Sequence, residues 1–190
     1  MIRLKNVSKK FGKKVIFKDF SLDIGNSGIY AVKGASGCGK TTLLRMIAGL
    51  DKKYSGDIEL ENIGKISYVF QEPRLLPNSD ALENVTLVLG NDNAASKKAK
   101  EMLSKMGLEN DLHTYPDQMS GGMKMRTAIA RALCYDGDLL LLDEAFNGID
   151  SERTKSIMDM IIEYAKERPV LFVTHNDEQI EYMGCKIIEI

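Results

Sequence analysis

The chain has 190 residues, a length that suits one domain, and 44% of them are hydrophobic against 28% charged, the balance of a globular protein with a substantial core. Its 26 Lys and Arg residues and 27 Asp and Glu residues leave a net charge of −1, which argues against a DNA-coating protein. We therefore expect no nucleic-acid partner.

Short strands are predicted for the first third of the chain. Apolar residues alternate over residues 2–7, and Val15–Ile24 is rich in β-branched and aromatic residues. Gly28–Val32 is a short apolar run that leads into a glycine-rich segment. After that segment, apolar residues at helical spacing predict a helix over Thr42–Leu50, and strands are expected again between about Asp57 and Phe70.

A mainly helical insert is predicted from about residue 72 to residue 125. Pro73 and Pro77 indicate a loop at its start. The Lys-, Ala- and Met-rich segment Ala94–Met106 has the amphipathic pattern of a helix. This composition distinguishes the insert from the strand-rich segment before it.

The second half of the chain alternates helices with buried strands. Helical patterns cover Gly121–Leu133 and Ser151–Glu167. Between them, the four consecutive leucines of Leu139–Leu142 are typical of a strand buried on both faces of a parallel sheet. Pro169–Thr174 and Lys186–Ile190 predict two more strands. Strand–helix alternation at both ends of the chain predicts an α/β fold with a mainly parallel sheet.

The glycine-rich segment matches the phosphate-loop pattern G-x-x-x-x-G-K-[ST] at Gly34, Gly39, Lys40 and Thr41. Glycines let the backbone curl so that N–H groups point at phosphate oxygens, and the following helix directs its positive dipole end to the same anion. Lys40 would neutralise phosphate charge, and the Thr41 hydroxyl would ligate Mg²⁺. The strand before the loop and the helix after it favour this interpretation over a glycine-rich surface turn. The expected nucleotide contacts are Gly34, Ala35, Ser36, Gly37, Cys38, Gly39, Lys40, Thr41 and Thr42.

Two adjacent carboxylates follow the leucine-rich strand. Asp143 is well placed to hold Mg²⁺ through water, and Glu144 could accept a proton from an attacking water. Taken alone, an Asp-Glu pair after an apolar strand could equally cap the next turn. Its combination with a phosphate loop favours the catalytic interpretation.

Further motifs follow one another along the chain. They are Phe11 near the end of the first strand, Gln71 within Val-Phe-Gln-Glu-Pro, Ser120 opening Ser-Gly-Gly, the segment Asn147–Asp150, and His175 after a buried strand. With the phosphate loop and the acidic pair, they resemble the nucleotide-binding subunits of ABC transporters. In that family the corresponding elements are the adenine-stacking aromatic, the Q-loop, the signature, the D-loop and the switch histidine. The resemblance covers nearly the whole chain.

The resemblance implies a P-loop NTPase core with an N-terminal antiparallel β-subdomain and a helical insert. All of residues 1–190 would form one ATP-binding domain. Its catalytic core would comprise about residues 1–71 and 126–190, and its helical subdomain about residues 72–125.

The resemblance also implies ATP and Mg²⁺ as ligands and a role for each motif residue. Phe11 would stack on adenine, although an aromatic at a strand end could also be ordinary core. Gln71 would reach Mg²⁺ and the attacking water, and His175 would hydrogen-bond the γ-phosphate or that water. Together with Glu144, these two residues would be catalytic. The remaining nucleotide contacts would come from Ser120, Gly121, Gly122 and Asp150.

In this family two nucleotide-binding units close head-to-tail on two ATP molecules, so the resemblance implies a homodimer that forms on ATP and reopens after hydrolysis. The motion would drive separate transmembrane permease subunits, because no apolar run approaches the roughly 20 residues of a spanning helix. The charged N-terminus does not fit a signal peptide, and the three widely spaced cysteines suit a reduced compartment. We therefore expect a cytoplasmic protein, peripheral on the cytoplasmic face of the cell membrane.

The signature departs from the family pattern at its flanks. Met119 and Met123 stand where Leu and Gln are usual, and a methionine cannot donate the polar contact of an amide, so turnover could be slow. The segment Phe70–Pro77 resembles the Q-loop of importers in the nitrate, sulfonate and taurine group.

Two other classes compete with the transport ATPase. A soluble, non-transport ABC protein of translation or DNA repair typically has two cassettes or a long coiled-coil insertion, and this sequence has neither. A monomeric P-loop kinase or GTPase would have no use for the Ser-Gly-Gly element. The transport ATPase is therefore the leading hypothesis.

Overall fold

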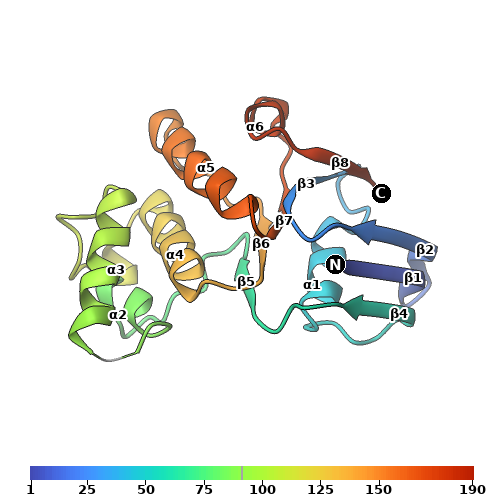
Figure 1. The fold of residues 1–190 in the computed structure, drawn as a ribbon, viewed down its shortest axis with the longest axis horizontal. Helices are drawn as coiled ribbons and strands as arrows, with labels where there is room; N and C mark the ends of the chain where they lie inside the picture. The colour runs from blue at the N-terminus through green and yellow to red at the C-terminus, as the bar shows by residue number, and fades with distance from the viewer. Residues whose placement is uncertain (91) are drawn as a thin grey trace.

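Two sheets and the helices packed around them form the structure, a computed structural model that describes residues 1–90 and 92–190 (Figure 1). The strands are β1 (Ile2–Phe11), β2 (Lys14–Ile24), β3 (Gly28–Lys33), β4 (Ser55–Leu60), β5 (Ile66–Val69), β6 (Leu139–Asp143), β7 (Pro169–Val173) and β8 (Lys186–Glu189). The helices are α1 (Lys40–Ile47), α2 (Ala81–Thr86), α3 (Asn93–Lys105), α4 (Gly121–Tyr135), α5 (Ser151–Ala165) and α6 (Asp177–Tyr182), with a short 3₁₀ helix at Pro116–Gln118.

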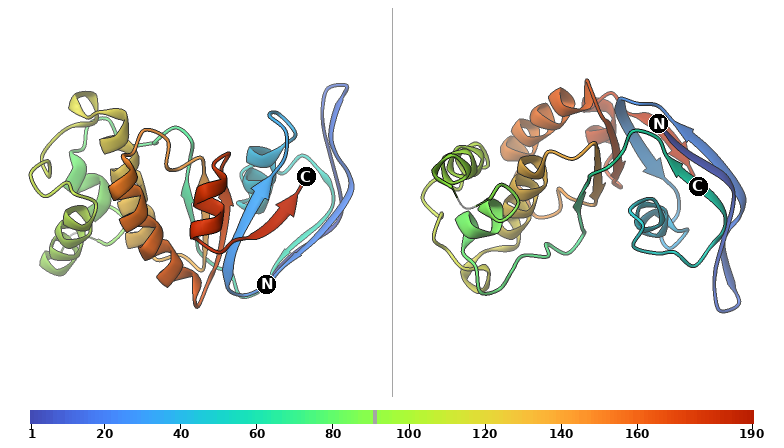
Figure 2. Two further views of the ribbon diagram at one scale, coloured as in Figure 1. Left: turned by 90° about the horizontal axis from the view of Figure 1, so that it is seen from above. Right: turned by 60° about the horizontal axis from the view of Figure 1, so that its bottom comes forward.

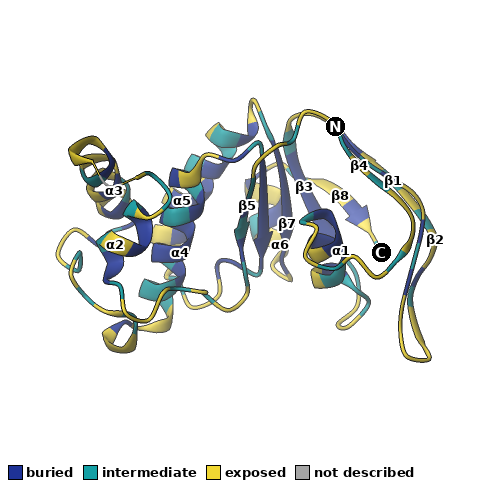
Figure 3. Cartoon of the chain, turned by 90° about the horizontal axis from the view of Figure 1, so that it is seen from below, coloured by how far each residue is buried: buried dark blue, intermediate teal, exposed yellow. Residues whose placement is uncertain are grey.

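The apolar runs of the sequence become a parallel sheet in the strand order β5-β6-β7-β3-β8. β6 and β7 are buried along their full length because helices cover both faces of the sheet (Figure 3). The leucines of β6 alternate between these faces. Leu139 and Leu141 pack with α1, whereas Leu140 and Leu142 pack with α4 and α5. The helices α1 and α4 therefore lie on opposite faces of the parallel sheet (Figure 2).

The N-terminal strands form a second, antiparallel sheet in the order β2-β1-β4. Ile2, Leu4 and Val7 of β1 are buried in the same apolar cluster as α1, and the residues between them are more exposed. As a result, α1 lies between the two sheets (Figure 3). The predicted α/β fold class is confirmed, with its mainly parallel sheet and its N-terminal antiparallel sheet.

The helices α2, α3 and α4 pack against one another beside the β5 edge of the parallel sheet (Figure 1). Buried residues such as Leu103 of α3 and Ile129 of α4 join this group to the apolar cluster on that face. α4 runs unbroken through residue 125, so the division of the chain at this residue stays a prediction. Within residues 1–90 and 92–190, even the longest helices, α4 and α5 with 15 residues each, fall short of the length and apolarity of a membrane span.

The differences from the predicted elements lie at helix ends and in short helices. The helix predicted over Thr42–Leu50 is α1, which begins at Lys40 and ends at Ile47, because Gly49 adopts a left-handed φ of 69°. The predicted strand region after it is two strands, β4 and β5, which belong to different sheets. The sequence patterns do not predict α2 or α6, because six residues are too few to display a helical period.

We expect Leu141→Ala to lower the free energy of unfolding by about 2–5 kcal/mol, because the substitution leaves a cavity in the core. Leu141 is 0% exposed in β6. The matched control is Leu87→Ala, since Leu87 is 59% exposed, and it should change the free energy by about 0.5 kcal/mol or less. Urea denaturation of both variants measures the difference. Equal losses in the two variants would contradict the central position of β6.

Candidate active site

The phosphate-loop segment joins β3 to α1 at the carboxyl end of the parallel sheet. Gly37 and Gly39 have φ values of 74° and 121°, backbone conformations that favour glycine. A Cβ on Gly39 would also lie 2.4 Å from Cγ2 of Ile16, so β2 packs directly on the loop. In the described part of the chain no side chain caps the start of α1. Its first N–H groups can therefore bind an anion.

The ammonium group of Lys40 is held inside this loop. Its Nζ donates to the carbonyl oxygens of Gly34 at 2.8 Å and Ala35 at 3.0 Å, and the residue is 7% exposed. The N–H of Cys38 closes a turn onto Ala35 O at 3.2 Å. A positive charge and curled backbone are thus gathered in one place, as phosphate binding requires.

Thr41 and Asp143 lie together where α1 meets the end of β6. Thr41 Oγ1 donates to Asp143 Oδ1 at 3.1 Å, and the Tyr68 hydroxyl reaches Asp143 Oδ2 at 3.5 Å. Asp143 is 2% exposed, and burial raises the pKa of its carboxyl group, although the hydrogen bond from Thr41 acts in the opposite direction. A hydroxyl and a carboxylate, oxygen donors of the kind that Mg²⁺ takes, therefore adjoin the phosphate loop.

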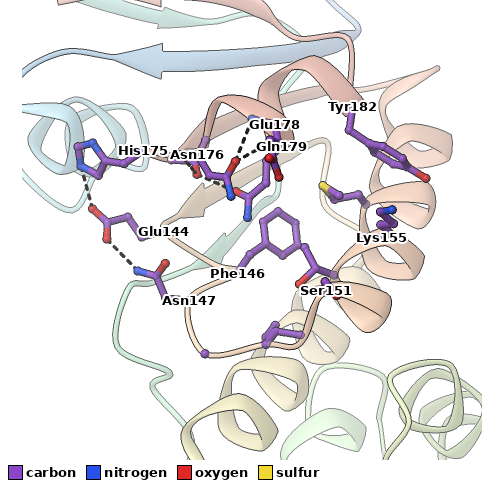
Figure 4. A pocket seen from close by; sticks show the side chains of 15 residues that line it. Glu144, Phe146, Asn147, Ser151, Lys155, His175, Asn176, Glu178, Gln179 and Tyr182 are labelled. Carbon is purple, nitrogen blue, oxygen red and sulfur yellow. Dashed lines mark hydrogen bonds and ion pairs between the residues drawn. The ribbon is translucent and has the colours of Figure 1, made fainter.

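Glu144 leaves the sheet directly after β6. Its φ of 50° is left-handed, while its N–H still donates to Val173 O at 2.9 Å. Its Oε2 accepts hydrogen bonds from Gln71 Nε2 at 3.3 Å and Asn147 Nδ2 at 3.0 Å. Its Oε1 lies 3.5 Å from His175 Nε2 (Figure 4). Side chains from three separate segments therefore converge on one carboxylate.

A cavity of about 710 Å³ opens beside Glu144 and His175 (Figure 4). One wall is the segment between β6 and α5, and the other is the segment from β7 into α6. In the second wall Thr174 Oγ1 donates to Gln179 Oε1 at 2.7 Å, and Asn176 caps α6. The cavity lies at the carboxyl end of parallel strands, where open α/β sheets bind ligands.

The signature residues lie away from the phosphate loop of the same chain. Ser120 caps α4 by accepting a hydrogen bond from the N–H of Met123 at 3.2 Å. Gly121 has open space where a Cβ would stand, whereas a Cβ on Gly122 would lie 2.4 Å from Gly148 O. Because α4 and α1 lie on opposite faces of the sheet, one copy of the chain does not bring its signature and its phosphate loop together.

Two other predicted residues are exposed. Phe11 is 52% exposed at the end of β1, with Lys9 Nζ 4.6 Å from its ring centroid, so it is not part of the core. Asp150 caps α5 by accepting from the N–H of Arg153 at 3.0 Å, and this hydrogen bond lowers the pKa of its carboxyl group. Both residues keep a surface that a partner or ligand can reach.

The sequence patterns miss two contacts of the site. Asn147 is recognised only as part of a motif, although its position three residues after Glu144, next to a turn, could have indicated a contact. The contact of Tyr68 with Asp143 has no comparable signal, since an aromatic residue in a strand is ordinarily a packing residue.

The family profile described as ABC transporter matches residues 17–147 of the chain. The chain belongs to the ABC transporter family. The aliphatic sulfonates import ATP-binding protein SsuB 1 of Xanthomonas axonopodis pv. citri (strain 306) is 34% identical, over 100% of this chain and 80% of its own. The ergothioneine transport ATP-binding protein EgtV of Helicobacter pylori (strain G27) is 35% identical, and the match covers 100% of this chain and 97% of EgtV. Among solved structures, the ATP-binding cassette MJ0796, in a dimeric post-hydrolysis state bound to ADP and Pi, matches with a TM-score of 0.90 and 31% identity, over 100% of this chain and 94% of that one.

The predicted resemblance is thereby confirmed. This ABC transporter chain has the cassette fold and is an ATP-hydrolysing enzyme. Its relatives include ATP-binding proteins of sulfonate import, which agrees with the resemblance of its Q-loop segment to importers of that group.

We expect Asp143→Asn to raise the melting temperature of the protein at neutral pH, in the absence of nucleotide and metal, because it removes a buried negative charge. Burial raises the pKa of this carboxyl group, so the folded chain binds its proton more tightly than the unfolded chain does. The corresponding stability is fully present below the unfolded pKa and is lost as the pH rises through the folded pKa. The advantage of the variant should therefore shrink as the pH falls towards the ordinary aspartate range.

Melting curves of the two proteins from about pH 3 to pH 8 measure this effect, since the range brackets the usual titration of aspartate. Asp57→Asn controls for the loss of one exposed charge on β4. An advantage of Asp143→Asn that stays constant over the whole range would contradict the prediction.

Proposed function

We propose that this chain is the ATP-binding and ATP-hydrolysing subunit that powers an ABC transporter through ATP-driven closure of a dimer of two copies. The observation that carries the proposal is the convergence of Gln71, Asn147 and His175 on the Glu144 carboxylate, next to Asp143. Glu144 is therefore held in place without being neutralised by a fixed lysine or arginine partner among the described residues. A general base must be held within reach of the proton that it accepts.

The phosphates of ATP bind along the phosphate loop, residues 34–42, and its adenine stacks on the exposed ring of Phe11. Thr41 and Asp143 hold Mg²⁺ together with the phosphates, and Gln71 reaches it from the Q-loop. The adjacent oxygens of Thr41 and Asp143 support this assignment. Within the described residues no three His, Cys, Asp or Glu side chains gather into a metal cage, and Mg²⁺ characteristically uses one or two carboxylates plus substrate phosphates. When bound, the ion neutralises charge that develops on the phosphates.

Hydrolysis needs a water molecule to attack the γ-phosphorus. Glu144 accepts a proton from this water while the water oxygen bonds to the γ-phosphorus. The bond between the γ-phosphorus and the bridging oxygen breaks, which releases ADP and inorganic phosphate. His175 donates a hydrogen bond to the γ-phosphate or the water. The amides of Gln71 and Asn147 keep the Glu144 carboxylate oriented.

A second copy completes the site. Its Ser120, Gly121 and Gly122 approach the γ-phosphate bound to the first copy, with Asp150 at the same interface. This is supported by the separation of α1 and α4 on opposite faces of the sheet and by the exposed, Ser-capped start of α4. Met123 has no donor where the family usually has Gln, so we expect slow turnover.

The transport partners are separate transmembrane permease subunits, and the chain works as a peripheral protein on the cytoplasmic face of the membrane. The match over the full chain to ATP-binding proteins of import systems supports this assignment over a non-transport ABC ATPase. Residues 1–71 and 126–190 then form the catalytic core, and residues 72–125 the helical subdomain that joins it to the permease.

We expect Glu144→Gln to lower the rate of ATP hydrolysis at least about 100-fold, because the amide cannot accept the proton of the attacking water. ATP binding should persist, since the phosphate loop is unchanged. Phosphate release and fluorescent-nucleotide binding measure the two properties. Glu101→Gln, on the exposed side of α3, is the matched control. Turnover at the unmodified rate in Glu144→Gln would exclude Glu144 as the base.

The same variant tests dimer closure. Light scattering should give the mass of a dimer with Mg-ATP and of a monomer with Mg-ADP, because the γ-phosphate favours the closed state. A monomer in both conditions would contradict closure of the isolated chain on ATP. Adding Met123→Gln to the variant then shows whether the altered signature is the cause.

A further inference from the structure

A stack of three side chains leads from the Q-loop segment to Asp143. The guanidinium carbon of Arg74 lies 4.2 Å from the ring centroid of Phe70. The rings of Phe70 and Tyr68 are 4.0 Å apart between centroids, with planes inclined by 14°. The Tyr68 hydroxyl ends the stack, 3.5 Å from Asp143 Oδ2. Tyr68 and Phe70 can stack in this way because residues two apart in an extended segment point to the same side.

The outer end of the stack is tied to the helices α2 and α4. The backbone oxygen of Arg74 accepts a hydrogen bond from Arg131 Nη2 of α4 at 2.7 Å. Asn84 of α2 is 0% exposed, and its side chain both accepts from Leu76 N at 2.8 Å and donates to Leu76 O at 3.2 Å. The segment after Gln71 is therefore held to the helices α2 and α4.

The inner end of the stack meets the buried carboxylate on the side that Thr41 leaves open. Thr41 donates to Oδ1 and the Tyr68 hydroxyl faces Oδ2, so each oxygen of Asp143 has one hydroxyl partner. A tyrosine phenol is protonated at neutral pH, so the Tyr68 hydroxyl can donate to Oδ2.

We propose that Tyr68 is a positioning residue that orients the Asp143 carboxylate for the metal, and that the stack through Phe70 and Arg74 makes this orientation depend on the Q-loop segment. The inference rests on the proposed function, in which Asp143 holds Mg²⁺. Hydroxyls and amides that orient a ligating carboxylate typically change metal affinity when they are removed. A movement of the Q-loop segment would then alter metal affinity through Tyr68, without any contact between that segment and the metal.

A purely structural role for Tyr68 makes a different prediction. If the ring only packs against Phe70, then Tyr68→Phe keeps the ring, the stack and the volume, and nothing should change. If the hydroxyl orients Asp143, the same variant should weaken metal binding while leaving the fold and the metal-free affinity for ATP unchanged. Tyr68→Phe, which removes only the hydroxyl oxygen, therefore distinguishes the two roles.

The test measures Mn²⁺, a paramagnetic substitute for Mg²⁺, by electron paramagnetic resonance in the presence of saturating ATP. All variants carry Glu144→Gln to prevent hydrolysis. We expect Tyr68→Phe to weaken Mn²⁺ binding about tenfold, the lower end of the usual range for residues that orient a metal ligand. ATP affinity in EDTA should stay within about twofold, because the phosphate loop is unchanged. Tyr135→Phe, which removes an exposed hydroxyl near the end of α4, is the matched control.

The coupling through the stack is tested with Phe70→Leu and Arg74→Met. Each should also weaken Mn²⁺ binding, and neither should weaken it further in combination with Tyr68→Phe, because all three act through one hydroxyl. Full additivity in these double variants would overturn the coupling. If Phe70→Leu does not fold, Arg74→Met, which alters only an exposed side chain, decides the point.

Asp143→Asn separates failure of this inference from failure of the proposed function. Loss of Mn²⁺ binding in Asp143→Asn with no change in Tyr68→Phe would overturn the positioning role alone. Unchanged Mn²⁺ binding in Asp143→Asn would overturn the metal assignment and the inference together. Loss in Asp143→Asn with weakening in Tyr68→Phe supports both.

Discussion

The complete burial of β6 is the constraint on which the active site depends. Leucines fill both faces of this strand, so a polar side chain can appear only where the strand ends. The register pairs Asp143 with Val173, so Asp143 is still part of the sheet and its carboxylate is buried. The chain leaves the sheet at Glu144, whose backbone is left-handed. Two neighbouring acids thus acquire different surroundings. One is enclosed and fixed by hydroxyls, and the other meets amides, a histidine and an open cavity.

The parallel sheet also separates the phosphate loop from the signature of the same chain. The phosphate loop belongs to the face covered by α1, and the signature belongs to the helix that covers the other face. The close approach of Gly122 to Gly148 joins the start of α4 to the segment that follows Glu144. The start of α4, which faces the second copy in the proposed dimer, is therefore in direct contact with the loop that follows Glu144. No side chain separates the two backbones at this contact, because both residues are glycines.

Local motifs were the most predictable part of this protein. The phosphate-loop pattern of Gly34 to Thr41 and the leucine run of Leu139 to Leu142 each occupy consecutive residues, so each could be recognised from the sequence alone. The helices α2 and α6 were not predicted, because six residues display no helical period. The Asp80–Glu83 capping box is a local signal for the start of α2, whereas the packing of α2 with α4 is not visible in the sequence. Contacts such as Tyr68 with Asp143 depend on the pairing of β5 with β6, which brings together residues 75 positions apart. Such contacts could not be predicted, because they follow from the order of strands in the sheet, which a single sequence does not reveal.

The enclosure of Lys40 has a consequence for the thermodynamics of ligand binding. An ammonium ion that stays in bulk water must lose much of its hydration shell, and a flexible side chain must lose rotamer freedom, when an anion binds. Here both losses occur when the chain folds, because the Gly34 and Ala35 carbonyls already replace water around Nζ. An incoming phosphate oxygen therefore meets a cation that is largely dehydrated and preorganised. The desolvation of Lys40 that is completed when the loop folds therefore also contributes to the affinity of the loop for anions.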